Sequence, residues 1–225
     1  MKIDDCRISD WMALNYMWVI NCCLILFLGI SFLAPILFKL KMSIPGWLLY
    51  KFFSPFCHQL AFRSWFLFGP QLYYPRALAG IPGILSYEQA TGDLILNLEF
   101  AREFIGNDAL GFKVALCQRD IAIYGSLLLF GLFFQIRGKK IKTLHWCIWI
   151  IFGLLPIGLD GITQFGGLGI NFLSWLPYRE STPLLRTFTG VLFGVTTGWF
   201  LYPMIEESMQ WSNKRKAIST SINHS

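Results

Sequence analysis

The chain contains four long apolar segments, separated by two short polar stretches and one long mixed stretch. The segments cover residues 17–38, 121–136, 144–159 and 188–204. The first holds about 22 residues, enough to cross a hydrocarbon layer of roughly 30 Å at 1.5 Å per residue. The pattern predicts an all-α integral membrane protein, a four-span helical bundle whose membrane domain covers residues 17–207.

The composition agrees with this class. Hydrophobic residues make up 55% of the chain and charged residues 14%, and the mean hydropathy is +0.51. The formal charge of +6 comes from short basic blocks beside the apolar segments. Bases in that position anchor to phospholipid and set topology. We therefore expect membrane lipids as partners and no nucleic acid.

The basic residues also predict an orientation. The loop 137–142 carries four bases, and residues 214–216 are all basic. The positive-inside rule puts this loop in the cytoplasm together with the N-terminal residues 1–16 and a flexible tail, 208–225. The first span lacks a basic flank before it, so we interpret it as a retained signal anchor of a protein in the cytoplasmic membrane.

The stretch between the first two spans, residues 39–120, is too long for a plain connector. We expect it to be a structured extracytoplasmic loop. Residues 45–68 are apolar and aromatic but interrupted by charges and Pro55, which predicts an interfacial or re-entrant helix, with a fifth span as the alternative. Further on, Asp93 is a candidate cap for a short helix over residues 94–105.

Polar residues gather at the ends of the spans that this topology places outside the cell. Among them, Cys57, His58 and Cys117 offer two thiolates and an imidazole, a ligand set that suits a divalent transition metal such as zinc. The spacing matches no known zinc finger. A Cys57–Cys117 disulfide is an equally physical interpretation outside the cytoplasm, and free, packed thiols are the third.

Further candidates for chemistry belong to the same polar clusters: Arg63, Arg119, Asp120, Asp160, Gln164 and Arg186. Asp120 or Asp160 would act as a general base, and the arginines would stabilise negative charge that develops on a substrate. Ion pairs that only hold the helices together fit the same residues.

The fourth span also carries a stripe of small residues, Gly190, Gly194 and Gly198. Such a stripe lets another helix approach closely, either within this bundle or across a homo-oligomer interface.

Four motifs in order carry a family resemblance: Cys57-His58-Gln59 with Arg63-Ser64, Cys117-x-Arg119 with Tyr124-Gly125, Asp160-Gly161-x-Thr163-Gln164, and Arg186-x-x-Thr189-Gly190. In these motifs the chain resembles the uncharacterised membrane family called domain of unknown function 2085, over most of residues 47–194. It departs from the pattern by a longer stretch over 69–112 and by Asp120 where many relatives carry a second Cys. The resemblance implies a multi-pass membrane protein with no established activity.

Three functions fit these observations. The first is a metal-assisted enzyme that acts on a lipid-linked or other anionic substrate. The second is a non-catalytic membrane protein with a structural polar lock and a Cys57–Cys117 disulfide. A small-solute permease is the third. The chain has no Walker loop, GxSxG, HExxH or CxxC signature that would select a known reaction.

Overall fold

Four long helical segments form the frame of the protein. The computed structural model describes residues 2–95, 97–165 and 179–223. Within these ranges, the segments long and apolar enough to cross a membrane are Trp11–Lys39, Gln118–Ile136, Trp146–Gln164 and Pro183–Trp211. The four-span prediction is therefore confirmed by length and composition. The spans are longer than predicted because polar residues at their ends, such as Arg119, Asp160 and Arg186, also lie within helices.

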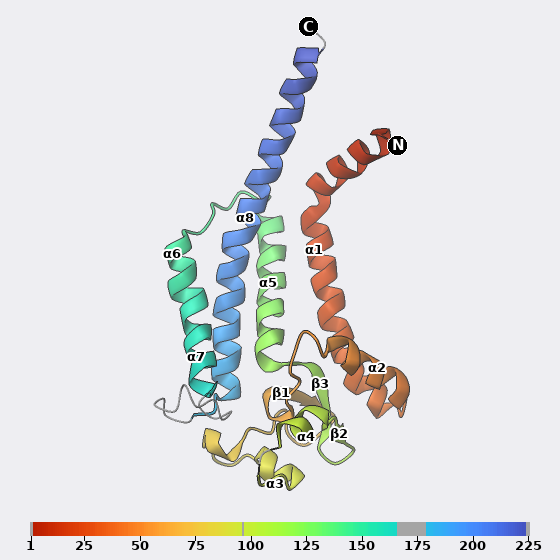
Figure 1. Cartoon of the computed structure of the whole chain (residues 1–225), viewed down its shortest axis with the longest axis vertical. Coiled ribbons are helices and arrows are strands. Elements are labelled where there is room, and N and C mark those ends of the chain that lie inside the picture. Colours follow the sequence, from red (N-terminus) through yellow and green to blue (C-terminus); the bar gives the residue numbers. More distant parts are fainter. Residues whose placement is uncertain (1, 96, 166–178, 224–225) are drawn as a thin grey trace.

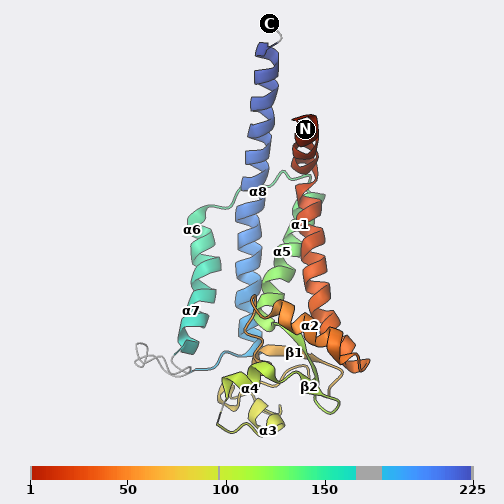
Figure 2. The same cartoon turned by 45° about the vertical axis from the view of Figure 1, so that its right-hand side comes forward.

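The spans belong to α1 (Lys2–Lys39), α5 (Gln118–Ile136), α8 (Pro183–Asn223) and one segment made of α6 (Trp146–Ile148), the π-helix η3 (Trp149–Leu154) and α7 (Leu155–Phe165). In Figures 1 and 2, α5 lies between α1 and α8, and α6 to α7 cover the other side of α8. Both termini lie at one end of the bundle. The helix α8 continues through residues expected to form a flexible tail.

The glycine stripe of α8 packs against α5 of the same chain. A Cβ at Gly190 would come within 2.8 Å of Arg119 O, and one at Gly194 would come within 2.5 Å of Ile123 O. At Gly198 a Cβ would approach the ring of Phe130 at 3.1 Å. Of the two uses that the sequence allowed for this stripe, the structure has the one within the bundle.

A folded cap of residues 40–117 lies at the end of the bundle opposite the termini (Figure 1). Its elements are α2 (Ser43–Phe53), η1 (Ala61–Arg63), β1 (Ser64–Leu67), η2 (Ala77–Ala79), α3 (Tyr87–Thr91), α4 (Leu98–Glu103), β2 (Gly106–Asn107) and β3 (Gly111–Cys117). The strands form an antiparallel sheet in the order β1-β3-β2. The all-α prediction is therefore wrong for this part of the chain.

The cap has an apolar core of its own, in which Phe62, Phe66, Tyr74, Tyr87 and Ala101 are each at most 1% exposed. Phe66 and Tyr74 meet edge to face, with ring centroids 4.9 Å apart. The predicted helix over 94–105 is shorter in the structure. It is α4, capped by the side chain of Asn97 instead of that of Asp93.

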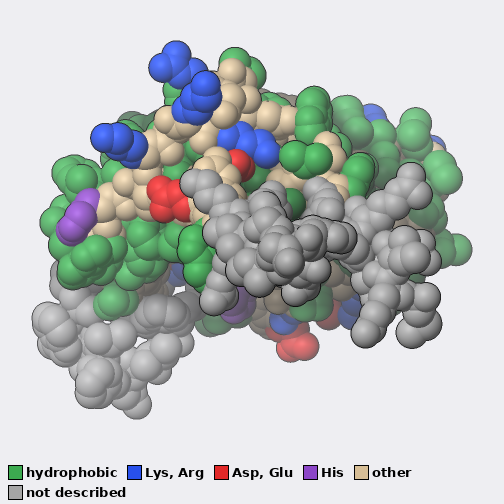
Figure 3. Space-filling model, turned by 90° about the horizontal axis from the view of Figure 1, so that it is seen from above, with side chains coloured by type: hydrophobic (Ala, Val, Ile, Leu, Met, Phe, Trp, Pro, Cys, Tyr) green, Lys and Arg blue, Asp and Glu red, His purple; other side chains and the backbone are tan. Residues whose placement is uncertain are grey.

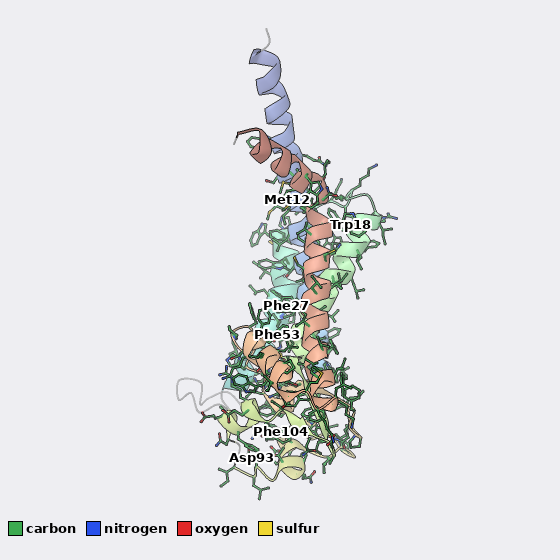
Figure 4. All side chains as sticks on the ribbon, turned by 90° about the vertical axis from the view of Figure 1, so that its right-hand side faces the viewer. Met12, Trp18, Phe27, Phe53, Asp93 and Phe104 are labelled. Carbon is green, nitrogen blue, oxygen red and sulfur yellow. The ribbon has the colours of Figure 1, made fainter. Side chains whose placement is uncertain are left out.

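Helix α2 doubles back along the end of α1. Tyr50 packs on Phe38 with ring centroids 5.8 Å apart, and Phe53 packs on Phe27, which lies deeper in the first span, at 5.0 Å. Figure 4 shows Phe53 just below Phe27, where bundle and cap meet. With 11 residues α2 is too short to cross a membrane. The chain that leaves its end enters the candidate site.

Candidate functional site

Most of the predicted site residues line one cavity between the cap and the bundle. This cavity, called the thiol cavity below, has a volume of about 180 Å³. It is lined by Phe56, Cys57, His58, Gln59, Leu60, Arg63, Cys117, Arg119, Asp120, Gln164 and Arg186. Of the predicted residues, Asp160 alone lies outside this lining, directly behind Arg119. Residues from four separate parts of the chain are thus brought to one place.

The strand pairing of the cap explains how the two cysteine motifs meet. Ser64 at the start of β1 pairs with Cys117 at the end of β3. Because β3 leads directly into α5, this pairing places the Cys57–Arg63 segment beside the first turn of α5. The buried side chain of Gln118 donates to Ser64 O at 3.2 Å and strengthens the junction.

Cys57, Cys117 and Asp120 form a compact group whose sulfur and oxygen atoms all lie within 4.8 Å of one another. The Cys117 thiol lies 3.1 Å from Asp120 Oδ2, and Cys57 Sγ accepts the backbone N–H of Cys117 at 3.3 Å. The hydrogen bond with Cys117, together with burial, raises the pKa of the Cys57 thiol. Both cysteines are free, so the structure does not contain the disulfide considered as an alternative.

Gln59 fixes the backbone that carries Cys57. Its φ of 55° is unusual for a residue other than glycine. Its buried side-chain amide donates to Tyr50 O at 3.0 Å and to Ala115 O at 2.9 Å, tying this turn to both α2 and β3. These bonds compensate for the strained conformation and hold the turn after Cys57 in place.

His58 is exposed at the rim of the thiol cavity. It lies outside the group formed by the two thiols and Asp120. The structure thus places a carboxylate where the sequence suggested an imidazole. The metal-ligand and catalytic roles assigned to all of these residues stay predictions.

Glu180 is the centre of a buried ion-pair cluster. Arg63 binds its two oxygens through Nε at 3.2 Å and Nη2 at 3.4 Å, and Arg76 approaches to 3.8 Å. Arg186, 2% exposed, donates both to Glu180 and to Gln164 Oε1, the latter at 3.0 Å. One carboxylate thereby joins the cap to the first turn of α8.

Asp160 is the centre of a second cluster, which joins α7 to α5. Its carboxylate accepts from Arg119, from Arg179 at 3.0 Å and from the Ser181 hydroxyl at 3.0 Å. This pairing makes Asp160 a counterion for arginine. Arg119 Nε is buried and has no hydrogen-bond partner among the described residues.

Three members of this network were given no role from the sequence: Glu180 and Ser181, which belong to the polar cluster 179–182, and Arg76, which was not noticed. Glu180 and Ser181 stand in a recognisably polar stretch just before α8, and a search for counterions of Arg63 and Arg186 would have included Glu180. Arg76 follows Pro75 in an irregular loop. No periodic pattern distinguishes it.

A second cavity, called the arginine cavity below, adjoins the first and has a volume of about 550 Å³. It shares His58, Leu60, Arg63, Arg119 and Gln164 with the thiol cavity and adds Arg102, among others. The site therefore has a thiol half and a strongly basic half.

Four apolar helices with a polar site at one end define a helical multi-pass membrane protein. Residues 107–200 match the family described as "Predicted membrane protein (DUF2085)", which confirms the resemblance. The last three motifs lie in this range, and the first precedes it. The chain is also similar to the uncharacterized protein MJ1492 of Methanocaldococcus jannaschii, with 27% identity over 201 residues, 85% of this chain and 93% of that protein. No solved structure matches the chain.

Proposed function

We propose that the protein binds a divalent transition metal such as zinc through Cys57, Cys117 and Asp120. The close approach of the three ligand atoms, within 4.8 Å of one another, carries this proposal. Zn–S bonds of about 2.3 Å and Zn–O bonds of about 2.0–2.2 Å separate tetrahedral ligands by about 3.3–3.8 Å. Small side-chain rotations bring the three atoms to that spacing. A cation would also offset the repulsion between three groups that become negative together.

Three protein ligands leave a fourth coordination position for water or substrate, as in catalytic zinc sites. Here that position would face a cavity lined by Arg63 and Arg119. A metal bound there would polarise an oxygen of an anionic, lipid-linked or soluble substrate. The arginines would bind the negative charge, and Asp120 would serve as a ligand instead of a general base.

The membrane orientation is part of this proposal. The exposed bases Arg137, Lys140 and Lys142 lie in the loop that follows α5, at the end of the bundle that carries both termini. Figure 3 shows Lys and Arg side chains gathered on one part of that face. The positive-inside rule supports a cytoplasmic position for this end, which leaves the cap and the site outside the cytoplasm.

The test is metal binding by the purified protein in detergent micelles. We expect one equivalent of Zn²⁺, and of Co²⁺ with a thiolate-to-cobalt charge-transfer band, in the wild type. Cys57→Ser and Cys117→Ser should each lower the affinity at least about tenfold, and Asp120→Asn should lower it less. Cys147→Ser is the control, because this free cysteine lies in α6, outside the site.

A purely structural site is the competing proposal. The two ion-pair clusters support it, because one connects the cap with α8 and the other connects α5 with α7. A wild type that binds neither metal, or a Cys57→Ser variant that binds as tightly as the wild type, would favour this alternative. Mass spectrometry without reductant tests it further, because a Cys57–Cys117 crosslink in the native protein excludes thiolate ligation.

A further inference from the structure

We propose that Arg119 and Arg63 bind a phosphate group in the arginine cavity. This site lies beside the thiol group and is distinct from it. The proposal rests on the proposed function only in that the bound phosphate would belong to the molecule presented to the metal. The anion site itself is inferred from the ion pairs that Arg63 and Arg119 form with Glu180 and Asp160, and from the cavity that both arginines line.

Arg119 has hydrogen-bonding capacity that the described protein groups do not use. Its Nη2 pairs with Asp160, whereas its Nε is buried without a partner. Leaving a buried donor unpaired is unfavourable. The Arg119 side chain is nevertheless 21% exposed and lines both cavities, so an anion in the arginine cavity can contact the part of this guanidinium that is not buried.

Arg63 reaches the same space from the cap. Its Nε and Nη2 bind Glu180, and Nη1 takes no part in that pair. The side chain is 20% exposed and lines both cavities. Two guanidinium groups from separate elements, η1 and α5, thus border one space, which suits an anion with several oxygens.

Arg186 has a different position. Its side chain is 2% exposed, and its guanidinium is bonded to both Glu180 and Gln164. It does not line the arginine cavity. We therefore assign it to holding the helices in place and leave it out of the anion site.

The charges around the arginine cavity favour an anion. Arg63, Arg102 and Arg119 line it with His58, against one carboxylate, Glu99. Asp160 and Glu180 pair with the arginines but do not line the cavity. The cavity thus presents cationic groups whose counterions lie behind them, which creates a positive potential inside it.

The apolar groups nearby suit a phosphate borne by a lipid. Leu60 and Leu98 line the arginine cavity. Phe56, which is 56% exposed, lines the thiol cavity and packs on Phe27 of the first span, with ring centroids 5.6 Å apart. The site therefore borders a surface suited to acyl chains. A soluble phosphate would use the same arginines, so the ligand chemistry is common to both sources.

The proposal is tested by isothermal titration calorimetry on the purified full-length protein in micelles of a non-ionic detergent. The probes are inorganic phosphate and dihexanoyl phosphatidic acid. We expect saturable binding that Arg119→Gln and Arg63→Gln each weaken at least about tenfold. Binding of the lipid tenfold or more tighter than phosphate identifies a lipid headgroup as the ligand, and similar affinities identify a soluble phosphate.

The chain provides a matched control for each variant. Arg179→Gln removes the other arginine of Asp160, and Arg76→Gln removes another arginine of Glu180, yet neither residue lines the arginine cavity. Both should keep affinity within about twofold of the wild type. Equal weakening by a variant and its control, or binding of neither probe, would overturn the proposal. Arg119→Lys retains a cation beside Asp160 but lacks the planar guanidinium with its several donors, so it should also bind more weakly even if Arg119→Gln folds poorly.

The same titration of Cys57→Ser separates this inference from the metal proposal. If Cys57→Ser binds phosphate as tightly as the wild type does, and the wild type takes up no zinc, the anion site is supported and the metal proposal is wrong. Zinc uptake by the wild type without binding of either phosphate probe would support the metal proposal and overturn the anion site.

Discussion

Among the described residues, the cap and the bundle each bury one cation almost completely, and they hold it in opposite ways. Lys113 in β3 is 0% exposed, and its ammonium group donates to the carbonyls of Gln59 at 2.7 Å and Arg102 at 2.6 Å. Arg186 in α8 is 2% exposed and pairs with the carboxylate of Glu180. One charge is solvated by neutral dipoles, and the other by an opposite charge.

This difference decides what each region tolerates. Burial lowers the pKa of Lys113 to about 7, so this amine can lose its charge in the folded cap at modest pH. A guanidinium remains charged at any pH a protein experiences. The bundle therefore depends on an intact charge pair, whereas the cap depends on an amine that serves as a hydrogen-bond donor in either state.

The largest effect should follow loss of the paired cation. Arg186→Met leaves Glu180 buried with two more distant arginines and should lower the free energy of unfolding by about 3–5 kcal/mol. Denaturation in detergent micelles measures this loss. Arg179→Met, at a side chain 49% exposed, should cost less than about 1 kcal/mol.

A second variant checks the cause. If the uncompensated carboxylate is responsible, Glu180→Gln should restore part of the stability lost in Arg186→Met. Equal losses for Arg186→Met and Arg179→Met would show that the bundle does not depend on this pair.

The cap should respond to pH. The pKa of Lys113 is about 7 in the folded protein, whereas an exposed lysine has a pKa of 10.5. Between these values the unfolded chain binds the additional proton, so stability rises as pH rises. From pH 7 to 10 the gain should be about 3 kcal/mol. Lys113→Met removes it, so the stability difference between wild type and variant, followed across this range, measures the effect.

Groups that face Lys113 do not obscure this test. Burial raises the pKa of Tyr50, and the pKa of Cys57 is raised as well, so both groups make stability fall as pH approaches 10. They do so in wild type and Lys113→Met alike, and their contribution cancels in the stability difference. If the free energies of unfolding of wild type and Lys113→Met change with pH in parallel, the cap holds a permanent charge, as the bundle does.

The contrast between the regions also explains what the sequence could predict. Spans are long and compositionally distinct, so hydropathy located them. The starts of the second and fourth spans were placed too late, because Arg119 and Arg186 look like loop residues until Asp160 and Glu180 are known to neutralise them. The identity of those partners depends on contacts between distant segments, about which periodicity carries no information.

The sheet was missed for a related reason. Residues 111–116 of β3 are buried throughout, so they lack the alternation that marks a half-buried strand. Lys113 also interrupts the apolar run. Two of the three interpretations of the sequence nevertheless brought Cys57 and Cys117 together, as metal ligands or as a disulfide, because both motifs lie at the same end of the bundle. The pairing of Ser64 with Cys117 is the structural cause.

The smallest effect concerns the spacing that holds Arg186 in place. Gly194 lets α8 approach α5, and a Cβ there would overlap Ser126 Oγ and lie 2.5 Å from Ile123 O. Gly194→Ala should therefore cost about 1–3 kcal/mol through overpacking. Gly125→Ala is the matched control on α5, because its Cβ would meet nothing within 4 Å and alanine favours the helix.

If α5–α8 spacing fixes the buried charge pair, Gly194→Ala combined with Arg186→Met should destabilise less than the sum of the single variants. Strict additivity would mean that the bundle holds its cation independently of helix spacing, and the contrast with the cap would then rest on the charge pair alone.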